Sequence, residues 1–272
     1  MQIQDTVSIA GTTVKGFRVL EVTQMSGYKT IPEFDGILGL RVNSKSKDSF
    51  VELAYKQKQI PEPILSFFID ESDTKGELIV GGFDPSQSAE AITWLPMSKV
   101  MFSEDQKEPL EFWAARIRSS QMAWYPENDL SKATSKTYPN QGYAIIDTGS
   151  SVSLVSQSFA DKLVASLGNH TRMSSENGQD PYAIACTEIP HLPNITISLV
   201  GGYDLKLTGW DYTLTFSDPA RSGSCYLSFF ADKALASQKD TIVLGNGILR
   251  YISLFCNILG NSCPCMITAD ND

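Results

Sequence analysis

The sequence predicts an all-β protein, mainly antiparallel, with a few short helices. Short runs of β-branched and aromatic residues recur along the chain and end at glycine or proline, as strands that lead into turns do. The 272 residues include 19 Gly and 13 Pro, and 10% of them are aromatic. This composition is typical of many strands and turns rather than of a helical bundle.

Charge and hydropathy exclude several classes of protein. Only 19% of the residues are charged and 42% are hydrophobic, so the chain can build a sizeable core and is not a highly charged disordered tail. The net charge of -9 repels phosphate backbones, so we expect no nucleic-acid partner. No apolar run reaches the roughly 18 residues that a membrane helix needs, so we expect no membrane span.

The first half of the chain reads mostly as strands separated by turns. Glycine and polar clusters bound the apolar runs, which predicts strands at residues 7–9, 14–22, 64–69, 77–80, 92–97 and 110–123. Ser49, followed three residues later by Glu52, forms a capping box, which predicts that a short helix begins there.

The second half continues the β pattern around one longer helix. A polar stretch at residues 126–140 is predicted to be a loop, and the apolar run at 142–147 to be a strand. Apolar residues at Phe159, Leu163 and Val164 have helical spacing, which predicts a helix near residues 156–167. The remaining strands are expected at residues 195–200, 203–207, 212–216 and 241–245.

Cysteines and glycosylation sequons indicate the secretory route. The five cysteines form no C-x-x-C pair and only two histidines occur, so a metal site is not supported. Cys186 and Cys225 could close a loop by a disulfide. Two N-x-T sequons make Asn169 and Asn194 candidate glycosylation sites, and Asn261 begins a weaker third. We therefore expect a secreted protein or one in the lysosomal or vacuolar lumen.

One short motif carries candidate chemistry. The apolar residues 143–146 lead directly into Asp147, Thr148, Gly149 and Ser150. An isolated aspartate at such a place is most often a turn residue. Here the apolar strand would hold the carboxylate at depth, the glycine permits a tight turn, and the two hydroxyls can hydrogen-bond a carboxylate. Asp147 is therefore the candidate catalytic residue.

Four motifs in order make the sequence resemble the pepsin-like aspartic proteases, up to about Phe255. The motifs are residues 34–40 (FDGILGL), 76–84 (GELIVGGFD), 144–151 (AIIDTGSS) and 241–245 (TIVLG). The resemblance implies the pepsin-like acid protease fold, in which two related lobes each give one aspartate to a shared site. It implies an aspartic endopeptidase without cofactor or metal, which binds a peptide or protein substrate and hydrolyses it with water activated between two aspartates.

The resemblance also implies roles for residues around the Asp-Thr-Gly loop. Thr148, Gly149 and Ser150 would support Asp147, with the Ser150 hydroxyl bracing the carboxylate. Asn246 stands where the family often has aspartate, which could alter the acidity of the site.

Further roles are implied away from the loop. Phe34 and Ile37 would line the pocket for the substrate residue before the scissile bond, and Ile145 would flank the primed side. All three would equally suit an ordinary core. Cys186 and Cys225 fall where the second lobe of the family carries a disulfide.

The 272 residues contain one Asp-Thr-Gly and no Asp-Ser-Gly. Counting back from Gly39 by the separation between Asp147 and Gly245 passes upstream of Met1. We therefore interpret residues 1–108 as a remnant of the first lobe with inter-lobe strands, and residues 109–272 as a complete second lobe. The first residues do not resemble a signal peptide, so we interpret the start as truncated. We expect the chain to be inactive without the missing first-lobe segment or a partner chain.

Several alternatives remain open. The chain could be a non-catalytic pseudoprotease or peptide-binding protein, or a homodimer that pairs Asp147 with Asp147. A serine hydrolase is poorly supported because no G-x-S-x-G motif occurs. An incomplete first lobe would leave apolar surface uncovered around Phe17, Val19, Phe34 and Leu38, so we expect association with a partner or aggregation.

Overall fold

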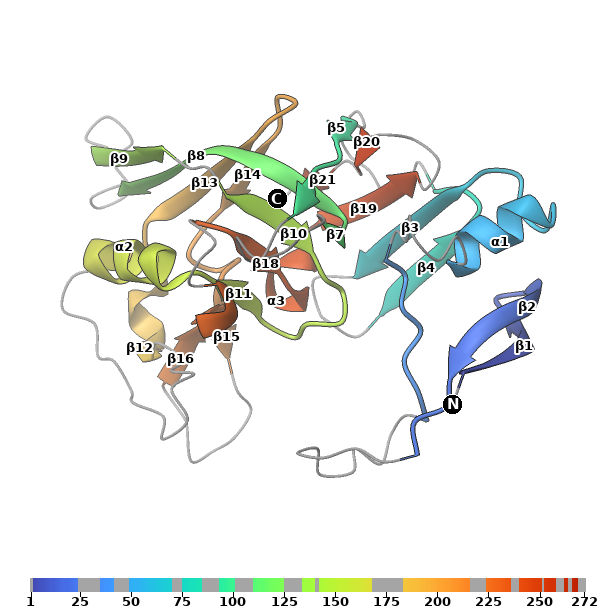
Figure 1. Cartoon of the computed structure of the whole chain (residues 1–272). Coiled ribbons are helices and arrows are strands. Elements are labelled where there is room, and N and C mark those ends of the chain that lie inside the picture. The colour runs from blue at the N-terminus through green and yellow to red at the C-terminus, as the bar shows by residue number, and fades with distance from the viewer. Residues whose placement is uncertain are drawn as a thin grey trace.

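The structure is a computed structural model that describes most of the chain. The described residues are 2–23, 35–41, 49–69, 75–84, 93–100, 110–124, 134–139, 142–167, 183–215, 224–235, 240–250, 252–257, 262–263 and 266–268. Strands dominate, and the few helices are short (Figure 1). The prediction of a mainly antiparallel all-β fold is therefore confirmed.

The largest sheet positions the Asp-Thr-Gly loop. In sheet order its strands are β14 (Asp204–Leu207), β13 (Asn194–Leu199), β8 (Ala114–Trp124), β10 (Tyr143–Ile146), β18 (Ile242–Leu244), β11 (Ser153–Val155) and β17 (Phe229–Ala231), and β9 (Thr134–Pro139) also pairs with β8. Most neighbours are antiparallel, but β10 with β18 and β11 with β17 are parallel. The loop between β10 and β11 must therefore pass the end of β18.

A second sheet joins segments that lie far apart in the sequence. Its order is β21 (Met266–Thr268), β19 (Ile252–Asn257), β3 (Ile64–Ile69) and β4 (Gly76–Val80). Strand β19 pairs antiparallel with β3, with Leu254 opposite Phe67. The division of the chain at residue 108 stays a prediction, and this sheet contains strands from both sides of it.

Four small sheets complete the β structure. They pair β1 (Gln2–Ile9) with β2 (Thr12–Leu20), β5 (Leu95–Pro96) with β20 (Ser262–Cys263), β6 (Lys99–Val100) with β7 (Leu110–Glu111), and β12 (Ala183–Ala185) with β16 (Ser224–Leu227) and β15 (Thr213–Thr215).

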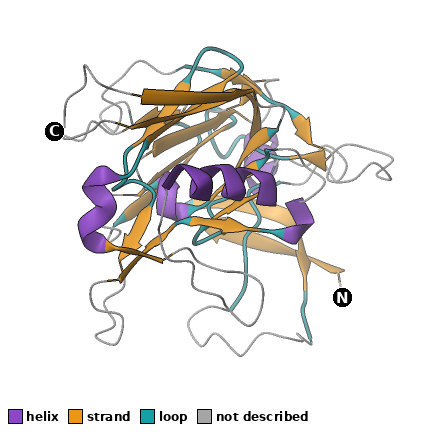
Figure 2. Cartoon of the chain, turned by 90° about the vertical axis from the view of Figure 1, so that its left-hand side faces the viewer, coloured by secondary structure: helices purple, strands orange, loops and turns teal. Residues whose placement is uncertain are grey.

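The two longer described helices each begin after a serine whose hydroxyl accepts a hydrogen bond from an amide of the first turn. Helix α1 (Phe50–Lys56) begins after Ser49, whose Oγ accepts the Glu52 amide at 3.2 Å, so the predicted helix start is confirmed. The Glu52 carboxylate pairs with Lys56 at 2.6 Å. Helix α2 (Gln157–Leu167) buries one apolar face toward the strands (Figure 2). Helix α3 (Asn246–Leu249) is a single turn, and 3₁₀ turns occupy Cys186–His191 and Lys233–Leu235. None of the described helices is long and apolar enough to cross a membrane.

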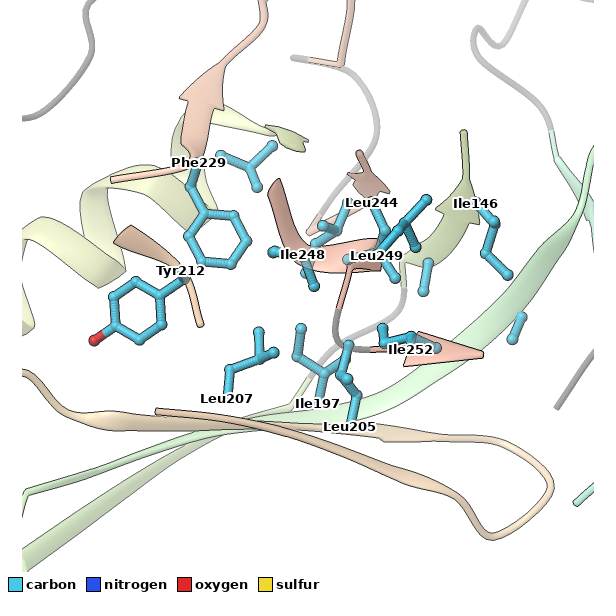
Figure 3. Packing of buried hydrophobic residues seen from close by; sticks show 14 of the residues in the cluster. Ile146, Ile197, Leu205, Leu207, Tyr212, Phe229, Leu244, Ile248, Leu249 and Ile252 are labelled. Carbon is cyan, nitrogen blue, oxygen red and sulfur yellow. The ribbon is translucent and has the colours of Figure 1, made fainter. Parts of the chain in front are cut away.

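One hydrophobic core lies between the large sheet and the elements that cover it (Figure 3). Aromatic side chains occupy one end of it, where the Phe229 ring packs 5.7 Å from that of Phe159 and 5.8 Å from that of Tyr212. Aliphatic side chains from β18 and α3, including Leu244, Ile248 and Leu249, fill the other end and are essentially inaccessible to solvent. The residues that follow the Thr241–Gly245 motif therefore anchor it in the core.

The N-terminal hairpin of β1 and β2 is mostly exposed, but its apolar residues differ from expectation. Phe17 is half-buried because its ring packs edge-on to Phe50 at 6.0 Å. Val19 and Leu38 are also half-buried, and Phe34 lies outside the described residues. Among the described residues, the large exposed apolar side chains are instead Ile3, Leu20, Val22, Ile37, Tyr55, Trp94, Val200 and Trp210.

Three predicted elements need correction. The stretch 126–140 is not entirely a loop, because β9 pairs with β8 from Thr134 to Pro139. Its side chains are almost all exposed, so the backbone ladder forms without the apolar alternation on which the prediction relied. Within the run 92–97, the described residues 93–97 form only the two-residue β5, and 110–123 is interrupted at Phe112 and Trp113 between β7 and β8.

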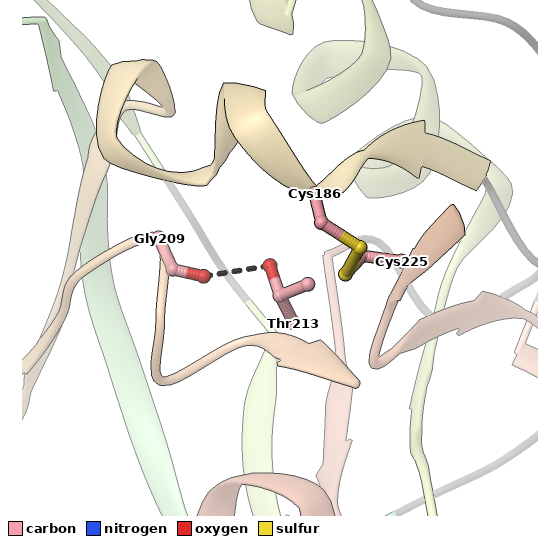
Figure 4. The surroundings of a disulfide bond; sticks show 4 residues. All are labelled: Cys186, Gly209, Thr213 and Cys225. Atoms are coloured by element: carbon pink, nitrogen blue, oxygen red, sulfur yellow. Dashed lines mark hydrogen bonds between the residues drawn. A yellow bond between two sulfur atoms is a disulfide. The ribbon is translucent and has the colours of Figure 1, made fainter. Parts of the chain in front are cut away.

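The predicted disulfide between Cys186 and Cys225 is present in the structure (Figure 4). It joins the first residue of the 3₁₀ turn to β16, with a Cα–Cα distance of 5.1 Å. Nearby, the Thr213 hydroxyl donates to the Gly209 carbonyl at 2.6 Å. The disulfide and this hydrogen bond hold the small sheet of β12, β16 and β15 on the end of the core.

Replacing Cys186 and Cys225 together by alanine should lower the free energy of unfolding by about 2–4 kcal/mol, because the bond closes a loop with a sequence separation of 39. Urea unfolding of the oxidised protein and the double variant measures the difference. Reduction of the unchanged protein should give a shift of the same size. Equal midpoints for oxidised protein and variant would contradict the expectation.

Tyr212 should make stability sensitive to alkaline pH. Burial, and to a smaller extent the Asp211 carboxylate, raise the pKa of its phenol far above the usual value of 10.0, and the phenol donates to the Pro193 carbonyl at 2.7 Å. The unfolded chain loses this proton near pH 10 whereas the folded chain keeps it, so the free energy of unfolding should fall as pH rises above about 10. Tyr212→Phe should lower stability at neutral pH by about 1–2 kcal/mol and flatten the alkaline fall. The exposed Tyr55 provides the control in Tyr55→Phe, which should do neither.

Candidate active site

The Asp-Thr-Gly loop connects two strands that lie on opposite sides of a third. Strand β10 pairs with β18 in parallel, and β11 pairs with the other edge of β18 in antiparallel. The chain between them, residues 147–152, must therefore cross over the carboxyl end of β18 (Figure 1). This crossing places Asp147 at the end of a buried strand, on the rim of the sheet.

Backbone hydrogen bonds hold Asp147 in this crossing. Its amide donates to the Leu244 carbonyl at 3.0 Å, and its carbonyl accepts the Ser150 amide at 3.1 Å. The Gly149 amide donates to Oδ1 of Asp147 at 2.9 Å. The last contact orients the carboxylate, because a charged acceptor strengthens the bond from the backbone donor.

The glycine after β18 lets the loop approach closely. A Cβ on Gly245 would lie 2.7 Å from the Ser150 carbonyl oxygen and closer still to that of Val152, nearer than nonbonded atoms approach. The Gly245 amide donates to the Ser153 hydroxyl at 3.0 Å, and the Asn246 amide donates to the Ser150 carbonyl at 2.8 Å. The loop of residues 147–152 can therefore pack against the motif of residues 241–245 only because position 245 has no side chain.

The serine expected to brace the carboxylate makes a different bond. The Ser150 hydroxyl donates its single proton to the Val152 carbonyl at 2.6 Å. That proton is therefore not available to Asp147 in this arrangement, and Ser150 supports the shape of the loop rather than the carboxylate. The carboxylate itself is exposed.

Thr148 lines a small cavity beside the strand that leads into Asp147. The cavity has a volume of about 40 Å³ and is mostly apolar, with Thr148, Trp113 and Cys256 among its lining residues. Cys256, the residue after Phe255 in β19, is buried. Leu40 lies on the same cavity, so two of the four sequence motifs meet here.

A tryptophan that the sequence analysis did not single out connects these two motifs. The Trp113 indole donates to the Leu40 carbonyl at 3.0 Å, and the Trp113 carbonyl accepts the Ile146 amide at 2.8 Å. The segment 35–41 is thereby fixed beside the strand that leads into Asp147. A buried tryptophan at the start of a strand is common, so no local signal marked this role.

The predicted substrate-binding residues are placed differently from one another. Ile145 is 3% exposed and packs in a small cluster with Ala114 and Val243, which is the environment of a core residue. Ile37 is 86% exposed, and a role for it stays a prediction. Phe34 lies outside the described residues.

The other predicted site residues are the sequon asparagines and Asn246. Asn169 lies outside the described residues, whereas Asn194 begins β13. Asn246 begins α3, and its Oδ1 is buried without a hydrogen-bond partner among the described residues. Among those residues, no group of three or more His, Cys, Asp and Glu side chains is arranged to hold a metal ion.

The arrangement defines a class of protein. A carboxylate held by a backbone amide on a loop that crosses between two strands, locked over a glycine, can bind and orient a water molecule. One carboxylate cannot at once take a proton from that water and donate one to a carbonyl oxygen. This geometry is the one expected of the Asp-Thr-Gly loop of an acid protease.

Residues 1–262 match the sequence profile described as eukaryotic aspartyl protease, and the chain belongs to that family. It is 26% identical over 258 residues to vacuolar protease A of Neurospora crassa, covering 93% of this chain and 57% of that protein. It is 28% identical over 261 residues to a vacuolar aspartic protease of Candida albicans, covering 93% and 55%. The chain thus spans about half the length of the curated relatives it matches.

The fold comparison agrees with this assignment. The crystal structure of an aspartic proteinase from Irpex lacteus superimposes with a TM-score of 0.74 and 19% sequence identity, covering 98% of this chain and 77% of that one. At this identity the match establishes the fold, and it confirms the expected pepsin-like architecture.

Gly245→Ala should disrupt the candidate site, whereas Gly39→Ala should not. An added Cβ at Gly245 meets the backbone carbonyls of Ser150 and Val152, while at Gly39 it meets no described atom within 4 Å. We expect a loss of about 2–4 kcal/mol in the free energy of unfolding for the first variant and less than about 0.5 kcal/mol for the second. Chemical denaturation measures both, and equal losses would contradict the role given to Gly245.

Proposed function

We propose that this chain acts in aspartic-type hydrolysis of peptide bonds and contributes Asp147 as one of two catalytic aspartates. The second aspartate would come from a complementing segment with its own Asp-Thr-Gly loop, either a first-lobe segment or a partner chain. Without it, the chain should be inactive. The observation that carries the proposal is the contrast between Gly245, which is covered by such a loop, and Gly39, which no residue that the structure describes covers.

The two glycines occupy equivalent places in similar motifs. Gly245 ends the apolar run 241–244, and Gly39 follows Ile37 and Leu38. Around Gly245 the loop after Asp147 fills the space that a side chain would need. Around Gly39 the same space is open among the described residues, and Ile37 two positions earlier is 86% exposed. A second loop packed on Gly39 would cover this surface.

The cavity supports the same arrangement. It lies between Leu40, which follows Gly39, and Thr148, which follows Asp147. Trp113 fixes these two segments relative to one another through its hydrogen bond to Leu40. A loop seated on Gly39 would therefore approach the loop of Asp147, which is where a second carboxylate is needed.

Two adjacent carboxylates would supply the chemistry that one lacks. Two carboxyl groups a few ångströms apart do not both ionise readily, because their negative charges repel. The pair therefore retains one proton at pH values at which an isolated aspartate would be fully ionised. The ionised member accepts a proton from a water molecule, which attacks the peptide carbonyl carbon. The protonated member donates its proton to the carbonyl oxygen. Gly149 keeps the Asp147 carboxylate oriented for either role.

We further propose that the chain works in the lumen of a vacuole or lysosome, or outside the cell. The disulfide between Cys186 and Cys225 suits an oxidising compartment. Relatives are named as vacuolar proteases and as cathepsin D. An acidic lumen would also favour the singly protonated carboxylate pair.

The complementation test uses the purified chain and a fluorogenic peptide at acidic pH. Alone, the chain should show no turnover above buffer. Co-expression with the segment of the Neurospora crassa relative that precedes the matched region should produce hydrolysis. Asp147→Asn should lower this hydrolysis by about 10²–10⁴-fold, because a general acid–base group is lost. Asp161→Asn, on α2, is the matched control and should leave it unchanged.

Three results would contradict the proposal or select an alternative. Hydrolysis by the chain alone that disappears in Asp147→Ala, together with a dimer in sedimentation, would establish the homodimer. The same hydrolysis by a monomer would show that one aspartate suffices. Binding of a peptide inhibitor without turnover in the complemented pair would indicate a non-catalytic binding protein.

A further inference from the structure

A glycosylation sequon lies on a regular strand of the large sheet. Asn194, Ile195 and Thr196 begin β13, whose burial alternates strictly along its six residues. Ile195, Ile197 and Leu199 are fully buried, so Asn194, Thr196 and Ser198 must point to the opposite, outer face. Both residues that define the sequon are therefore on the solvent side of the sheet.

The strands beside β13 carry polar side chains on this outer face. Thr196 lies opposite Gln121 of β8 and opposite Lys206 of β14. The Gln121 amide reaches across to β9, donating to the Thr137 hydroxyl at 3.3 Å. The face thus has hydroxyl and amide groups that can hydrogen-bond to a sugar.

Asn194, which is half-buried, has small residues beside it on the neighbouring strands. Its partner on β8 is Ala123, and the partner of Ala123 on β9 is Ser135. On its other side β14 ends at Leu207, which pairs with Ile195, so no β14 residue lies opposite Asn194. A bulky group attached to the amide nitrogen would meet two small side chains and the end of a strand.

We propose that Asn194 is an N-glycosylation site and that its glycan lies over the outer face of β13, β8 and β9. The glycan would be transferred from a lipid-linked oligosaccharide diphosphate, the usual donor class for Asn-x-Thr sites. A bond forms between the asparagine amide nitrogen and the first sugar carbon. The bond from that carbon to the phosphate oxygen breaks, and the amide proton leaves with the lipid diphosphate. The Thr196 hydroxyl is part of the recognised sequon.

The site lies well away from Asp147. Asn194 pairs with Ala123 near one end of β8, while Ile145, two residues before Asp147, pairs with Ala114 at the other end. Nine residues of extended strand correspond to about 30 Å. A glycan on Asn194 would therefore cover the sheet without obstructing the candidate active site, and this inference depends on the secretory route but not on catalysis.

The experiment expresses the full chain behind a secretory leader in a glycosylating yeast. Only protein with the Cys186–Cys225 bond closed is analysed. Peptides are mapped by mass spectrometry after enzymatic glycan release in heavy-oxygen water, which marks each asparagine that had carried sugar. Mapping separates Asn194 from the other sequons at Asn169 and Asn261.

The expected result is a marked Asn194 in the unchanged protein, and no mark in Asn194→Gln or Thr196→Ala. Thr196→Ser keeps the sequon and should keep the mark, while Ser198→Ala changes a neighbouring hydroxyl on the same face and should also keep it. The two Thr196 variants distinguish loss of the sequon from a general effect of substitution on the fold. An unmarked Asn194 in disulfide-closed protein would overturn the proposal, as would a mark that persists in Thr196→Ala.

Discussion

The close approach of the 147–152 loop to the backbone at Gly245 is the constraint on which the candidate site depends. Carbonyl groups of Ser150 and Val152 occupy the volume of the missing side chain, and the amides of Asn246 and Gly247 donate hydrogen bonds back to the loop. The direction of the Asp147 carboxylate follows, since the loop has no freedom to turn once it is seated. The side chains of Ile248 and Leu249, which follow Gly245, are buried in the core. Packing in the core therefore fixes the backbone against which the Asp147 loop rests.

The fold could be predicted in some detail because buried strands can be recognised in the sequence. Apolar and polar residues alternate in a strand with one buried face, and a strand buried on both faces is a continuous apolar run. Strands such as β3, β10 and β13 lie where these patterns place them. Strand β9 was missed because its side chains are exposed and polar, so its pairing with β8 depends on backbone hydrogen bonds that leave no trace in the side-chain pattern. Pairing of β19 with β3 likewise depends on tertiary contacts between distant segments.

The features of the site that depend on residues close together in the sequence could be predicted. Asp147 and Gly149 stand in the geometry expected of them, and the disulfide follows from the two cysteines and the family resemblance. The partner of the Ser150 hydroxyl was not predictable, because Asp147 and the Val152 carbonyl are both within its local reach and only the loop conformation decides between them. Trp113 escaped notice because its importance comes from a hydrogen bond to a residue 73 positions away.

The sheet that unites β3 with β19 has a consequence for how the polypeptide matures during synthesis. Strands β3 and β4 can form a hairpin as soon as they leave the ribosome, but β3 keeps one unpaired edge until β19, near the other end of the chain, has been made. Such an edge attracts other strands, and long-range pairings form slowly. The nascent chain is therefore exposed to pairing with other chains for the interval in which this edge is open.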